Sequence, residues 1–80
     1  MSEDTVEPFF RELAASAGTA ALSDAEADAV LDLTRVVAHT RERRLAPLTA
    51  YAAALAFAGL DEAGRIARLG ALIYQLRAEQ

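Results

Sequence analysis

The chain has 80 residues, no cysteine, twelve acidic residues and eight basic residues that are all arginine, and its formal net charge is −4 at pH 7. This length indicates one domain, residues 1–80, and the absence of cysteine excludes disulfides and thiolate metal sites. The acidic balance disfavours a nucleic-acid-binding protein, because affinity for nucleic acid comes mostly from neutralising phosphates.

Two features disfavour a secreted or membrane protein. Residues 1–7 (MSEDTVE) are acidic, the reverse of the basic start of a signal peptide. The uncharged segment 45–60 has sixteen residues, fewer than the about 20 that a membrane-spanning helix needs. We therefore expect a cytoplasmic protein without a membrane partner.

A first helix is expected from about Val6 to Ala17. Thr5 is a suitable cap, and Pro8 is tolerated in a first turn because its missing N–H would have no partner there. Gly18 is expected to end the helix.

The second helix has the clearest start. Ser23 and Glu26 fit a capping box, in which the serine bonds forward and the glutamate bonds back. The helix should continue to about Arg43. Its buried face is expected to be formed by residues at helical spacing: Ala27, Val30, Leu31, Thr34, Val37 and Ala38.

The uncharged segment from Leu45 to Leu60 predicts a third helix with almost no solvent-facing side, and we expect it at the centre of the bundle. Pro47 suits its first position and Gly59 a left-handed end.

A fourth helix, capped by Asp61, should run to about Ala78. One of its faces is a stripe of large apolar residues. A second strip is mostly small and is a candidate seam for self-association. The seam residues are Ala67, Gly70, Ala71 and Tyr74. The expected fold is therefore an all-α, compact four-helix bundle with a central hydrophobic third helix.

The main candidate for chemistry is a polar stripe on the second helix. Its members recur at steps of three or four residues and are Asp28, Asp32, Arg35, His39 and Arg43. Opposite charges at this spacing are typical of a solvated face. The alternative is a binding strip centred on the titratable His39. With one histidine in the chain, the stripe does not favour a metal site, and no cofactor is expected.

Arg44 extends this strip at the end of the second helix, where Arg41 and Arg43 also lie. Cations are favourable at a helix C-terminus on dipole grounds alone, whereas a site for an acidic partner or a phosphate is the functional alternative. No glycine-rich phosphate loop supports that alternative. With three serines, one of them a cap, a serine–histidine–acid triad is not supported, so we do not expect an enzyme.

The middle of the chain resembles a known family. The segments DLTR (32–35), AH (38–39), Arg43 and APLT (46–49) resemble the motifs of a small actinobacterial helical domain. Genes for that family lie beside, or are fused to, the guanylyltransferase of molybdenum-cofactor biosynthesis. Arg44 and Leu45 depart from its pattern, which usually has proline and alanine there.

We therefore expect a non-catalytic accessory module that binds a protein partner. The resemblance implies a partner among molybdenum-cofactor enzymes or molybdoenzymes, and the small-residue seam allows a homo-oligomer. The candidate binding residues are Asp32, Arg35, His39, Arg43 and Arg44. Two alternatives stay open: a nucleotide- or pterin-binding protein that uses His39 and the arginines, and a weak nucleic-acid-binding helical module.

Overall fold

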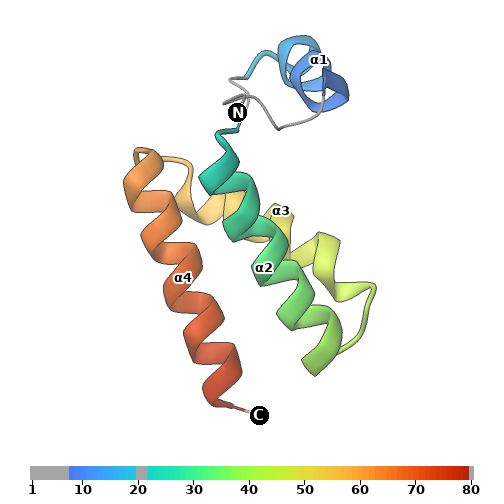
Figure 1. Ribbon diagram of the computed structural model, residues 1–80, viewed down its shortest axis with the longest axis vertical. Coiled ribbons are helices and arrows are strands. Elements are labelled where there is room, and N and C mark those ends of the chain that lie inside the picture. The colour runs from blue at the N-terminus through green and yellow to red at the C-terminus, as the bar shows by residue number, and fades with distance from the viewer. Residues whose placement is uncertain (1–7, 20–21, 80) are drawn as a thin grey trace.

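The chain folds as four α-helices without a strand in the described part (Figure 1), which confirms the expected all-α class. This computed structural model describes residues 8–19 and 22–79. The helices are α1 (Pro8–Ala17), α2 (Asp24–Thr40), α3 (Leu45–Phe57) and α4 (Glu62–Ala78). The start expected at Val6 lies outside the described residues, and the other predicted boundaries agree to within about one turn. The proposed cap Thr5 lies outside the described residues.

Local capping explains where two helices begin. The Ser23 side chain accepts a hydrogen bond from the Glu26 N–H (3.1 Å), and the Asp61 side chain accepts one from the Gly64 N–H (2.8 Å). Gly18, at φ 80°, ends α1 in the left-handed conformation that glycine adopts without steric cost. Gly59 does not have the left-handed conformation predicted for it, because α3 ends earlier, at Phe57.

The centre of the fold is α2, not α3. α2 packs against both α3 and α4, which contact each other far less. The buried cluster joins Leu33 and Val37 of α2 to Ala53 of α3 and Leu69 of α4. Leu33 is completely inaccessible to solvent.

The prediction of a central third helix is therefore wrong. Only Ala53 of α3 is buried. The absence of charge in 45–60 predicts burial on all sides, but α3 packs mainly against α2 and its opposite side faces solvent. Lack of charge alone does not separate a buried helix from one with an exposed apolar face.

The buried face of α2 is also rotated from the predicted one, although Val37 is buried as expected. Leu33 and Val36 are buried, whereas Leu31, expected inside, is exposed. On α4 the expected apolar stripe is correct, since Leu69 is buried and Leu72, Ile73 and Leu76 pack against the core.

Helix α1 stands apart from the other three (Figure 1). It has no buried residue, and no Cα of α1 lies within 8 Å of a Cα in another helix. Phe9, Phe10 and Leu13 are accordingly exposed. No helix in the described part of the chain is long and apolar enough to cross a membrane.

Candidate functional site

The most distinctive surface is the outward side of α3. Leu48, Tyr51 and Leu55 lie there and are 63%, 68% and 65% exposed. Ala52 lies among them and is also exposed. With steps of three, one and three residues, these four side chains share one side of the helix. We call these four residues the outer face of α3.

The outer face lies opposite the side that packs on α2. The inward side includes Ala50, Ala53 and Phe57, which are buried or half-buried. At 100° per residue, the mean directions of the two sets differ by nearly half a turn. α3 is therefore apolar on two opposite sides, and only one of them has a neighbour among the described residues.

Charged groups flank α3 at both ends and none lies within it. Arg43 and Arg44 precede it, and Asp61 and Glu62 follow it. Arg44 pairs with Glu42 at 2.9 Å. Arg43 is exposed and makes no ion pair with another described residue. The outer face thus runs from a basic end to an acidic end.

The predicted polar stripe on α2 lies at the surface. Arg35 donates to Asp32 at 2.6 Å, and both side chains are more than half exposed. Asp28 and His39 are also exposed. No group of three or more potential metal-ligating side chains occurs among the described residues.

The structure adds one residue to this stripe that sequence spacing could not identify. Arg77 of α4 joins Arg35, Val36 and His39 around an open cleft of about 190 Å³. Arg43 and Arg44 lie beyond the end of α2 and do not line it. The cleft therefore collects two guanidinium groups and one imidazole from two helices.

The predicted seam on α4 is a solvent-facing surface. Ala67, Gly70 and Ala71 are exposed, and Tyr74 is 77% exposed. A methyl group added at Gly70 would meet no atom within 4 Å. The seam is accessible, and nothing in the described chain covers it at Gly70.

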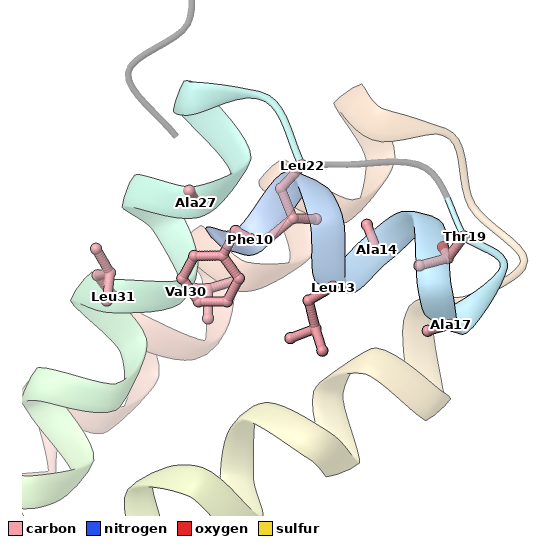
Figure 2. A pocket seen from close by; sticks show the side chains of 9 residues that line it. All are labelled: Phe10, Leu13, Ala14, Ala17, Thr19, Leu22, Ala27, Val30 and Leu31. Atoms are coloured by element: carbon pink, nitrogen blue, oxygen red, sulfur yellow. The ribbon is translucent and has the colours of Figure 1, made fainter. Parts of the chain in front are cut away.

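Two cavities lie beside α2, and residues of α1 line the first of them. The first, of about 360 Å³, has apolar walls except for Thr19. Figure 2 shows Phe10 and Leu13 reaching from α1 into it, opposite residues of α2. The second, of about 460 Å³, continues past Leu22 and Val30 to the surfaces of α3 and α4. The first cavity shows that space remains between α1 and α2.

An ion pair between α2 and α4 forms part of the second cavity's wall. Arg65 Nε lies 2.5 Å from Glu26 Oε2, and Arg65 Nη2 lies 2.9 Å from Glu26 Oε1. Arg65 Nη1 donates to the Leu60 carbonyl at 2.8 Å. The pKa of Arg65 is raised above its ordinary value, chiefly by hydrogen bonding to Glu26. Each of the three guanidinium nitrogens already donates a hydrogen bond, so we assign the pair to orienting two helices and not to binding a ligand.

The ion pair corrects the predicted capping box. Glu26 was expected to bond back to the Ser23 backbone, but its carboxylate binds Arg65 instead. The Ser23 hydroxyl donates to Glu62 while its oxygen accepts from the Glu26 N–H. The ion pair with α4 takes the place of the Glu26 half of the capping box. Residue spacing within α2 could not predict this ion pair, because Arg65 belongs to another helix.

The chain is similar to a protein family. No curated protein and no solved structure matches the chain. Residues 1–80, the whole chain, match the model of a family described as "Domain of unknown function (DUF6457)". The four-helix chain with its exposed α3 face therefore belongs to the DUF6457 family.

Proposed function

We propose that this domain is a helical protein–protein interaction module and that its docking surface is the outer face of α3. The observation that carries the proposal is the exposure of Leu48, Tyr51 and Leu55, each more than 60% accessible, on one side of an uncharged helix. Contiguous apolar patches on a protein surface mark interaction sites. A few side chains near the centre of an interface supply most of its binding energy, and tyrosine is common among them.

A binding role fits the chemistry of this face better than catalysis does. The outer face offers one phenol hydroxyl and no charged group, so it has no second group beside that hydroxyl to activate it for proton transfer or nucleophilic attack. Its shape suits a second helix, because a row of side chains at steps of three and four residues packs into the grooves of a facing helix.

The partner proposal rests on the resemblance to the domain found with molybdenum-cofactor guanylyltransferase. We propose that the partner is a molybdenum-cofactor enzyme or a molybdoenzyme in the cytoplasm. The experiment is co-expression of the tagged domain with that guanylyltransferase, followed by co-purification. Leu55→Glu should abolish recovery of the partner, because a carboxylate would be buried against apolar groups.

The control is Leu31→Glu, which places the same charge at an exposed leucine of α2. It should leave recovery unchanged. Equal recovery with both variants would rule out the α3 face, and failure of the unmodified domain to recover the enzyme would rule out this partner.

A second candidate function is binding of an anionic small molecule, such as a guanine nucleotide or a phosphorylated pterin. The convergence of Arg35, His39 and Arg77 around one cleft favours it, since arginine binds phosphate in a fixed fork geometry. Thermal-shift measurements with these ligands test it. Stabilisation that is lost in Arg77→Ala but kept in Arg68→Ala, a change of an exposed arginine outside the cleft, would support it. No shift at millimolar ligand would exclude it.

A further inference from the structure

We infer that the outer face of α3 binds the same face of a second copy of this chain, with the two helices antiparallel. This inference rests on the proposed function and names one occupant for the proposed surface. Three properties of the face support it: its internal spacing, its lack of charge, and the opposite charges at its two ends.

The spacing of the side chains is self-complementary. Leu48 and Leu55 lie equally far from the midpoint between Tyr51 and Ala52. A two-fold axis through this midpoint places Leu48 against the partner's Leu55 and Tyr51 over the partner's Ala52. Each large ring then meets a small residue, which is the complementarity that close helix packing requires.

No charge has to leave water when this interface forms. Residues 45–60 contain no charged side chain, so two copies can approach along the full length of α3, about 20 Å for thirteen residues. The polar group at the centre, the Tyr51 hydroxyl, can extend past the partner's Ala52 to the solvent-exposed rim.

The charges at the ends select the antiparallel direction. An antiparallel pair brings Arg43 of one copy toward the partner's Glu62 at both ends of the interface, and it also aligns the helix dipoles favourably. A parallel pair would instead bring the two Arg43 side chains together. Arg43 has no ion-pair partner among the described residues of its own chain, so it is available for this contact.

One helix pair is a small interface, so the dimer should be weak. Small interfaces are typical of transient complexes. Sedimentation equilibrium at about 5 to 500 μM protein covers the range in which such complexes dissociate. The unmodified chain should show a reversible monomer–dimer equilibrium in this range. A chain that stays monomeric throughout would overturn the inference.

Single substitutions locate the interface. Leu55→Glu should weaken the dimer at least about tenfold, because it would place a carboxylate against the partner's Leu48. Leu31→Glu is the matched control on α2 and should leave the equilibrium unchanged. If Leu55→Glu dimerises as well as the unmodified chain, another surface such as the α4 seam forms the dimer and the inference fails.

A charge exchange tests the direction of the helices. Arg43→Glu and Glu62→Arg should each weaken self-association by a few-fold, because each variant alone places like charges at both ends. A mixture of the two variants should recover the original dimer strength, because every end then joins opposite charges. Circular dichroism of each variant confirms that the helices are intact. Single variants that dimerise normally would exclude the antiparallel pair.

These outcomes separate the inference from the function on which it rests. If the chain is monomeric but Leu55→Glu still prevents recovery of an enzyme partner, the inference fails and the interaction function stands. If the chain dimerises through α3 and recovers no enzyme, the inference stands and the partner proposal fails.

Discussion

Glu26 of α2 and Arg65 of α4, which are 39 residues apart in the sequence, form a bidentate ion pair that joins the two longest helices. The Glu26 side chain is 7% exposed and the Arg65 side chain 32%. Because water hardly reaches the carboxylate, its negative charge is stabilised mainly by Arg65, whereas part of the Arg65 side chain is still in contact with water.

This asymmetry predicts unequal effects of the two conservative substitutions. Arg65→Met leaves a buried carboxylate without a cation and should lower the urea midpoint of unfolding strongly. Glu26→Gln keeps a hydrogen-bond acceptor for Arg65, which can also turn to solvent, and should lower the midpoint less. Equal losses for both variants would mean that the two charges share the same environment. Arg68→Met, at an exposed arginine one turn later, is the control and should have little effect.

Two leucines on α2 should respond very differently to truncation. Leu33 is inaccessible to solvent, while Leu31 is 56% exposed. Leu33→Ala should lower the free energy of unfolding by about 2 to 5 kcal/mol, because it removes buried contacts and leaves a cavity. Leu31→Ala should change it by less than about 1 kcal/mol. Chemical denaturation followed by circular dichroism measures both, and a reversed order would contradict the observed rotation of α2.

Two glycines should respond to alanine in opposite directions. Gly70 lies within α4 with open space around it, so Gly70→Ala should stabilise the protein by about 0.5 to 1 kcal/mol through helix propensity. Gly18 has φ 80°, where an added methyl group is strained, so Gly18→Ala should shorten or weaken α1 by about 1 kcal/mol. Thermal melts of both variants, with amide exchange in α1 for the second, test this pair.

Removal of residues 1–21 should leave a folded body of three helices. α1 contributes no buried residue, whereas the core cluster belongs entirely to α2, α3 and α4. We expect the shortened chain to keep a cooperative unfolding transition and to lose only the helix signal of about ten residues. Loss of cooperativity would show that α1 has a structural role that its exposure does not indicate.

The candidate sites were predictable to different extents. The residues of the α2 stripe and the α4 seam follow from helical spacing, and all of them lie at the surface. The contribution of Arg77 to the cleft beside His39 did not follow from spacing, because it depends on how α4 lies along α2. The partnership of Glu26 and Arg65 was missed for the same reason.

Local interactions between residues close in the sequence determined the number of helices and most of the residues at which they begin and end. Ser23 and Asp61 cap helices because of hydrogen bonds to residues three positions away, and Gly18 ends one because it lacks a side chain. Only the tertiary structure decided which helix is central. An uncharged helix such as α3 can lower its free energy by packing on one side or on all sides, and the choice depends on whether its neighbours can surround it. Here α2 occupies the middle, so Leu48, Tyr51 and Leu55 face solvent.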